Sequence, residues 1–211
     1  MPTGFNHFDI VYYINLKHRD DRNEHIQSEL HSTGIDKNKI HRIDAVYHKD
    51  FGALGCSKSH ITAIEMFLNT SDDIKNCLIL EDDFSIKYPI HLVNDILDKF
   101  FSSEIDYDVL MVSANICECE NTNDAFVKKI ISAQTTSGYC VNKRYAPILL
   151  QNFKDGYKLL EEAGIQVHDF CIDIFWKQIQ REHKWFCTYP VIGEQMESYS
   201  DIEKKITYYR C

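Results

Sequence analysis

The stretch that decides the fold runs from Cys77 to Phe84, "CLILEDDF", where an apolar run ends in three consecutive acids. Four apolar residues without helical periodicity are typical of a strand that is buried on both faces. Glu81, Asp82 and Asp83 repel one another at neutral pH, so either water or a cation must screen their charges. The stretch therefore predicts a buried strand that leads directly into solvent or into a charged site.

Apolar runs of the same kind recur on both sides of this strand and alternate with helical patterns. We expect strands at residues 8–16, 39–46, 76–80, 107–114 and 184–192, and helices at 20–34, 55–70, 88–101, 145–164 and 168–183. The alternation predicts an α/β fold with a mainly parallel central sheet and helices on both faces. Residues 125–143 look like two strands separated by polar residues, which can make the sheet mixed there.

Length and composition set the broad class of the protein. A chain of 211 residues fits a single domain, and its net charge of −9 argues against nucleic acid as a partner. The first residues lack an export signal and no window holds eighteen apolar residues, so we expect a cytoplasmic chain without a membrane span. The eight cysteines are then expected to be reduced thiols, and the close pair Cys117 and Cys119 lacks the second half of a zinc pattern.

The acidic triplet has a spacing that suits a metal ion. In an extended chain Glu81 and Asp83 face one side and Asp82 the other, and all three follow the carboxyl end of a strand, where α/β proteins bind ligands. Carboxylate oxygens select hard cations such as Mg²⁺ or Mn²⁺. A solvated strand end, or a cap for the helix near Tyr88, is the alternative interpretation.

Five stretches resemble glycosyltransferase family 25, which includes lipooligosaccharide and procollagen galactosyltransferases and relatives in large DNA viruses. They occur in the family's order and span nearly the whole chain: "YYINLKHRDDR", "GCSKSH", "LILEDDF", "TSGYCVNK" and "YPVIGEQMESYSDIE". The resemblance implies a GT-A-type fold, a divalent metal (Mn²⁺ or Mg²⁺) and an inverting transfer from a UDP-sugar. It also implies one catalytic domain over 1–211, with a donor half at about 1–115 and an acceptor half at about 116–211.

The resemblance assigns the metal and donor sites to the ends of the first and third strands. Asp83 is expected to bind the metal directly, and Glu81 directly or through water. His168 can complete the metal's coordination, with a purely structural histidine as the alternative. Asp82 is expected to reach the ribose or uracil. Asn15, Arg19 and Arg22 are expected to bind the donor, since an arginine fork suits phosphate; local ion pairs of the two arginines with Asp20 or Asp21 are the alternative.

Two further motifs are expected to complete the donor site. "GCSKSH" places Ser59 and His60 at an expected junction of loop and helix, where free N–H groups bind anions; a serine cap and a packed histidine are the alternative. Gln195, Ser200 and Asp201 follow the last strand, in a segment that can close over the donor or remain a solvated loop. Related sequences have arginine where this chain has Met196, which weakens any arginine contribution to binding the diphosphate.

An inverting transfer also requires a general base, and "VHDFCIDIFW" offers Asp169 and Asp173 on one face of the expected helix. By resemblance we expect one of them to be the base, with Asp169 slightly favoured; a helix cap is the alternative role of Asp169. Galactose is the family's commonest sugar, and the acceptor can be a glycan or a collagen-like protein. A metal-dependent phosphohydrolase and a non-catalytic binding module remain alternatives.

Overall fold

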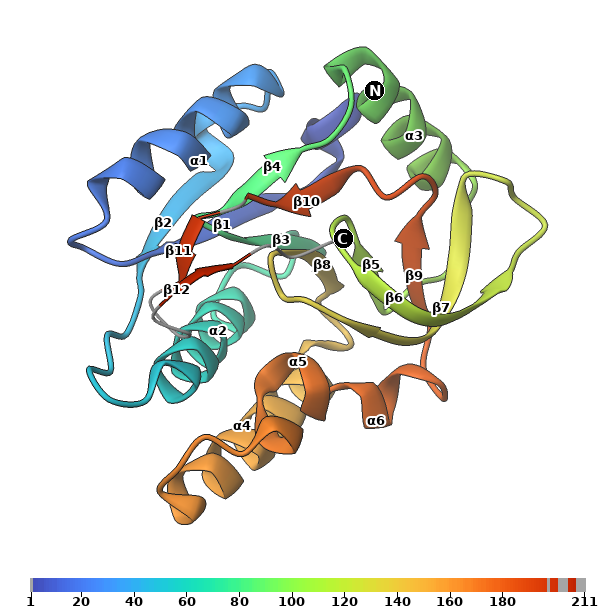
Figure 1. The fold of residues 1–211 in the computed structure, drawn as a ribbon. Coiled ribbons are helices and arrows are strands. Elements are labelled where there is room, and N and C mark those ends of the chain that lie inside the picture. Colours follow the sequence, from blue (N-terminus) through green and yellow to red (C-terminus); the bar gives the residue numbers. More distant parts are fainter. Residues whose placement is uncertain (1, 197, 201–204, 208–211) are drawn as a thin grey trace.

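The computed structural model describes residues 2–196, 198–200 and 205–207 (Figure 1). Its strands are β1 (Ile10–Asn15), β2 (Ile40–Asp44), β3 (Asn76–Glu81), β4 (Phe84–Ile86), β5 (Val109–Met111), β6 (Asn115–Asn121), β7 (Val127–Gln134), β8 (Gly138–Asn142), β9 (Trp185–Thr188), β10 (Gly193–Gln195), β11 (Ser198–Ser200) and β12 (Lys205–Thr207). Its helices are α1 (Asp20–Ser32), α2 (Gly52–Leu68), α3 (Ile90–Ser102), α4 (Ala146–Ala163), α5 (Ile172–Phe175) and α6 (Lys177–Gln180). Three short 3₁₀ helices are η1 (Gly4–His7), η2 (Lys37–Lys39) and η3 (His168–Phe170).

Eight of the described strands form one sheet in the order β2-β1-β3-β8-β5-β9-β7-β6. The pairs β1–β2, β1–β3 and β5–β9 are parallel, whereas the other four pairs are antiparallel. The sheet is therefore not mainly parallel, and it becomes mixed at residues 125–143 as the sequence suggests. The sheet is mixed because β8 enters between β3 and β5 in the opposite direction, and because β6 and β7 form an antiparallel pair beside β9.

Helices cover both faces of the sheet, as the sequence predicts. In Figure 1, α1 and α3 lie above the sheet, while α2, α4, α5 and α6 lie below it. Successive residues of β1 alternate between the two cores: Tyr12 packs with the side of α2 and α4, and Tyr13 packs with the side of α1 and α3. This alternation explains why the central strands read as continuous apolar runs. No helix in the described part of the chain has the length and apolar character that crossing a bilayer requires.

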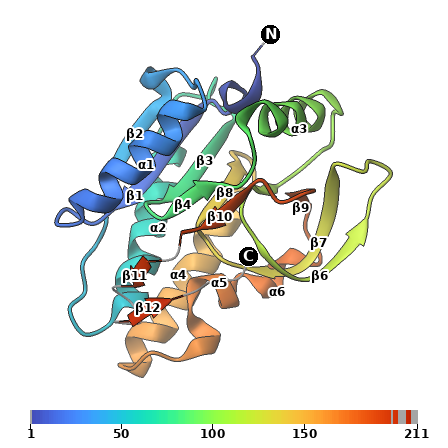
Figure 2. The ribbon, with the colours of Figure 1, turned by 45° about the horizontal axis from the view of Figure 1, so that its top comes forward.

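A small two-stranded sheet of β4 and β10 lies over one end of the main sheet, and the two strands run side by side in Figures 1 and 2. Its antiparallel register pairs Gln195 with Phe84, the aromatic residue that follows the three acids. Phe84 is almost fully buried, and a Cβ on Gly193 would lie 2.1 Å from its ring. The absence of a side chain at Gly193 therefore lets β10 close over Phe84, and this contact brings Gln195 next to Asp83.

Candidate functional site

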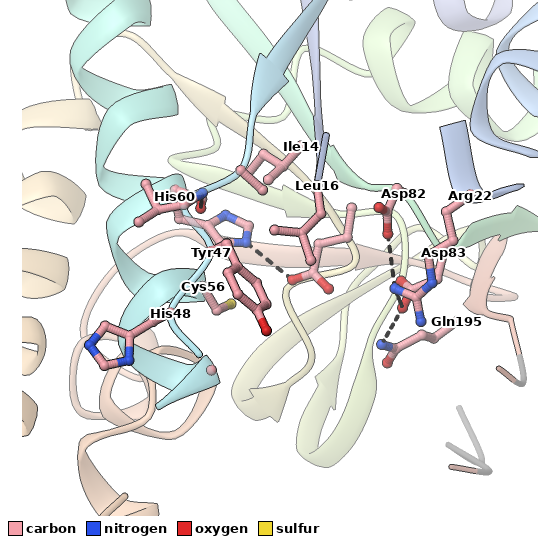
Figure 3. Close-up of a pocket in the computed structure, with 15 residues that line it drawn as sticks. Ile14, Leu16, Arg22, Tyr47, His48, Cys56, His60, Asp82, Asp83 and Gln195 are labelled. Atoms are coloured by element: carbon pink, nitrogen blue, oxygen red, sulfur yellow. Dashed lines mark hydrogen bonds and ion pairs between the residues drawn. The ribbon is translucent and has the colours of Figure 1, made fainter. Parts of the chain in front are cut away.

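The acids line a pocket at the carboxyl ends of β1 and β3 (Figure 3). Asp82, Asp83 and Arg22 lie on one side of this pocket, and Cys56 and His60 of α2 lie on the other. The loop between β2 and α2 supplies another wall. The pocket is lined by Ile14, Leu16, Arg22, Ala45, Val46, Tyr47, His48, Gly52, Cys56, Ser59, His60, Glu81, Asp82, Asp83 and Gln195.

The three acids do not alternate as the sequence predicts. Strand β3 ends at Glu81, and Asp82 and Asp83 lie in the turn before β4. The turn aims both aspartates at one arginine: Arg22 Nη1 lies 2.9 Å from Asp82 Oδ1 and 3.1 Å from Asp83 Oδ2. Glu81 instead contacts His60 and Thr136. The prediction that Glu81 and Asp83 share one direction fails because the chain is no longer extended after Glu81.

Asp83 is the most confined of the three acids, with only 4% of its surface exposed. Gln195 Nε2 donates to Asp83 Oδ2 at 3.0 Å, whereas the buried Oδ1 has no hydrogen-bond partner among the described residues. Burial, followed by the negative charge of Glu81, raises the pKa of Asp83 to about 7. A buried carboxylate oxygen without a partner, in a region crowded with negative charge, fits a cation.

Asp82 is held by Asn15 of β1 and Arg22 of α1, two residues that the sequence predicts for donor binding. Asn15 Nδ2 donates to Asp82 Oδ2 at 2.8 Å, and Arg22 Nη1 donates to Asp82 Oδ1 at 2.9 Å. Tertiary structure thus brings together Asn15, Arg22 and the acids. Arg19 donates through Nε and Nη2 to Asp21. Arg19 therefore forms the local ion pair that was the alternative to donor binding.

Glu81 belongs to a second group of side chains. His60 Nε2 lies 3.1 Å from Glu81 Oε1, and Thr136 Oγ1 donates to the same oxygen. Although burial raises the pKa of Glu81, the hydrogen bonds from His60 and Thr136 and the charge of Arg22 outweigh it, so the net pKa is lowered. Cys56 Sγ, a ring nitrogen of His60 and a Glu81 oxygen lie within 4.8 Å of one another.

Within the described residues, this group is the one set of three or more His, Cys, Asp and Glu side chains whose ligand atoms lie close enough to share a metal ion. The predicted set of Glu81, Asp83 and His168 does not come together in that way. Cys56 was missed because all eight cysteines were expected to be reduced thiols without a metal. Its spacing of four residues from His60, on the same helical face, is the signal that could have found it.

The motif "GCSKSH" lies inside α2, which begins at Gly52, so neither the predicted junction nor its serine cap forms. Ser59 Oγ donates to Gly55 O at 2.7 Å and accepts from Val46 N at 2.8 Å. This pair of bonds ties the loop after β2 to the helix. A Cβ on Gly55 would lie 2.3 Å from the Val46 carbonyl oxygen, so only glycine allows the loop to cross the helix here.

The exchange Gly55→Ala is expected to destabilise the protein by about 1–3 kcal/mol, because the new methyl group meets backbone that cannot rotate away. Alanine's higher helix propensity offsets at most about 1 kcal/mol of this cost. The free energy of unfolding from urea titration measures the change. Lys58→Ala, at an exposed position of the same helix, is the control and should stay within about 0.5 kcal/mol of the native chain. Equal effects of the two exchanges would contradict the close contact.

A second pocket adjoins the first, and Cys56, Glu81 and Gln195 line both. Asp173 at the start of α5 also lines the second pocket, where Thr135 N donates to its Oδ2 at 3.2 Å. The backbone of Thr135 has a φ of 86°, a conformation that residues other than glycine rarely adopt. Burial raises the pKa of Asp173. The turn between β7 and β8 thus holds a perturbed carboxylate next to Glu81.

The predicted helix at 168–183 is broken into η3, α5 and α6, so Asp169 and Asp173 do not share one helical face. The side chains of His168 and Asp169 are 79% and 84% exposed and lie 3.4 Å apart. His168 lines the second pocket, but its exposure differs from the burial of Asp83 and the partial burial of Glu81. Ser200 lies in β11, and Asp201 lies outside the described residues.

No protein-family model matches the chain, and no curated protein matches it in sequence. Among solved structures, it is similar to a glycosyltransferase involved in the glycosylation of the major capsid of PBCV-1, with a TM-score of 0.56 and 11% identity over 92% of this chain and 95% of that chain. A second match is A197 from STIV, with a TM-score of 0.45 and 8% identity over 95% of this chain and 99% of that chain. A third is mannose-1-phosphate geranyltransferase from Thermus thermophilus, with a TM-score of 0.43 and 9% identity over 90% of this chain and 60% of that chain.

The first likeness shows the fold alone, and the other two are too weak to carry an argument. The predicted GT-A-type α/β fold is confirmed. Membership of glycosyltransferase family 25 stays a prediction, because these comparisons assign no family.

Proposed function

We propose that the protein is a metal-dependent, inverting glycosyltransferase that moves a hexose from a UDP-sugar to a hydroxyl group of an acceptor. The observation that carries this proposal is the buried Asp83 Oδ1, which has no hydrogen-bond partner among the described residues and lies in a pocket at the carboxyl ends of β1 and β3. The fold of a solved glycosyltransferase supports it. Galactose as the sugar and Mn²⁺ as the metal rest on the resemblance to family 25.

The first pocket would bind the donor. Asp83 would hold a divalent cation, with the negative charge of Glu81 nearby, and such a cation would stabilise the negative charge that develops on the leaving diphosphate. Arg22 fixes both neighbouring aspartates and keeps them from repelling each other, so that Asp83 presents its free oxygen to the pocket. Asn15 holds Asp82 in place, where its carboxylate can face the ribose.

The second pocket would bind the acceptor, with Asp173 as the general base. In an inverting transfer the acceptor oxygen attacks the anomeric carbon from the side opposite UDP, its proton passes to a carboxylate, and the bond to the diphosphate breaks. Asp173 lies in a pocket that adjoins the donor pocket at Glu81 and Gln195. Its raised pKa makes it a stronger base than an ordinary aspartate. Asp169 is exposed and less suited to this role.

Isothermal calorimetry with UDP and Mn²⁺ tests the donor site. The native chain is expected to bind UDP only when the metal is present, and Asp83→Asn should abolish this binding, because the amide keeps the shape but loses the charge. Asp169→Asn, at an exposed position of η3, is the matched control and should bind normally. UDP binding that needs no metal, or that survives in Asp83→Asn, would contradict the assignment. Release of UDP from a panel of UDP-sugars then separates an enzyme from a binding module.

A further inference from the structure

Cys56, His60 and Glu81 form a cluster that the donor site does not explain. Cys56 and His60 are one helical turn apart on α2, and Glu81 is the last residue of β3. The sulfur, a ring nitrogen and a carboxylate oxygen of these residues lie within 4.8 Å of one another. We propose that they form a transition-metal site of the Zn²⁺ class, separate from the hard-cation site at Asp83. This proposal does not depend on the transferase function.

The three ligand atoms decide which class of metal the cluster would bind. A thiolate and an imidazole favour Zn²⁺ or Co²⁺, whereas Mg²⁺ and Ca²⁺ prefer sites made of oxygen atoms alone. Three protein ligands leave one position of a tetrahedral ion open, as in catalytic rather than structural zinc sites. Cys56 and Glu81 line both pockets, so this open position would face a space that a small ligand or water can reach.

The surroundings of His60 fit a metal ligand whose second ring nitrogen is fixed by a hydrogen bond. Tyr139 OH lies 2.9 Å from His60 Nδ1, and the two rings stack with centroids 5.7 Å apart. With Nδ1–H donated to the tyrosine oxygen, Nε2 keeps its lone pair on the side of Cys56 and Glu81. Histidines that bind metals are commonly oriented by such a bond on their other nitrogen. Without a metal, the ring takes the other tautomer: Nε2–H donates a hydrogen bond to Glu81, and Nδ1 accepts one from Tyr139 OH.

Glu81 would link this site to the donor site, because it faces Cys56 and His60 while its charge also acts on Asp83. An ion in the cluster draws Glu81 toward α2 and away from a cation at Asp83. If the transferase proposal holds, excess Zn²⁺ is then expected to inhibit the Mn²⁺-dependent reaction. This consequence rests on the proposed function, whereas binding of the metal itself does not.

Titration of the metal-free full-length chain with Co²⁺ tests the site by absorbance. We expect one equivalent to give the thiolate-to-cobalt charge-transfer band and the intense d–d bands of a tetrahedral ion, as the Cys56 thiol releases its proton to the buffer. Cys56→Ser should remove the charge-transfer band with little change of side-chain volume. Tyr139→Phe should weaken the binding by about 10- to 100-fold, because the ring of His60 loses its orienting bond.

Two control variants separate this site from its neighbours. Cys171→Ser changes a half-buried thiol of the second pocket that lies outside the cluster, and it should leave the band unchanged. Asp83→Asn should bind Co²⁺ normally even though it loses UDP and Mn²⁺, so failure of one proposal is distinguishable from failure of the other. Absence of a charge-transfer band in the native chain, its persistence in Cys56→Ser, or its loss in Cys171→Ser would overturn the proposal. Melting temperatures of all variants show whether each one is folded.

Discussion

Replacing Arg22 with methionine is expected to lower the free energy of unfolding by about 3–5 kcal/mol, the usual cost of leaving buried charges without their partner. The Arg22 side chain is 11% exposed, and it contacts the side chains of Asp82 and Asp83, which are 8% and 5% exposed. Methionine retains much of the volume of the arginine stem, so the change isolates the loss of charge. Urea denaturation at pH 8 provides the measurement.

The decrease in the free energy of unfolding caused by Arg22→Met should be larger at high pH than at low pH. The pKa of Asp83 in the folded chain is about 7, above the ordinary value of 3.8, so this group stabilises the fold at low pH and that contribution is lost as pH rises through about 7. Removing Arg22 raises the carboxyl pKa values further, because its positive charge lowers them. The cost of Arg22→Met should therefore be smaller at pH 5, where the folded variant can protonate Asp83, than at pH 8.

A variant that removes the acids together with the arginine provides the control. Arg22→Met combined with Asp82→Asn and Asp83→Asn leaves no uncompensated charge, and it should recover most of the lost stability while still failing to bind UDP and Mn²⁺. If Arg22→Met alone costs less than about 1 kcal/mol at pH 8, the ion pairs behave like exposed ones, and the buried arrangement of the three side chains is contradicted.

Replacing Asp173 with asparagine is expected to reduce kcat by about 10²–10⁴-fold, the usual contribution of a general base, with UDP binding unchanged. Asparagine can still accept the hydrogen bond from Thr135 N through its oxygen, so the site should keep its shape. UDP release at saturating donor, measured with and without an acceptor, gives kcat. Burial raises the pKa of Asp173, so the acid limb of the native kcat profile should lie above the usual range of an aspartate and disappear in the variant.

Asp169→Asn is the matched control for this experiment, because it changes the same chemical group four residues away at an exposed position. It should retain nearly full activity. The reverse result, with Asp169→Asn inactive and Asp173→Asn active, would transfer the role of base to Asp169. Full activity in both variants would remove the general base from these two residues.

Periodicity predicted most of the fold because the central strands and the long helices are buried. The residues of β3 and β1 lie in the core on both faces, and this two-sided burial is what the apolar runs record. Strand β6 was missed because its residues are mostly exposed at the edge of the sheet and carry no apolar pattern. Strands β4 and β10 were missed because each is three residues long and forms only by pairing with the other.

The sequence by itself determined that Asn15 and the three acids lie at the carboxyl ends of two strands, since that follows from local patterns and from the rules of α/β folds. Only the tertiary structure decided which side chains those acids meet. Arg22 and Gln195 approach Asp83 from α1 and β10, while Cys56, His60 and Thr136 approach Glu81 from α2 and the turn after β7. Local periodicity reports which residues are buried, but the partner of a charge depends on segments far apart in the chain. For this reason the triplet in "CLILEDDF" divides between two sets of partners, a division that no short stretch of the chain encodes.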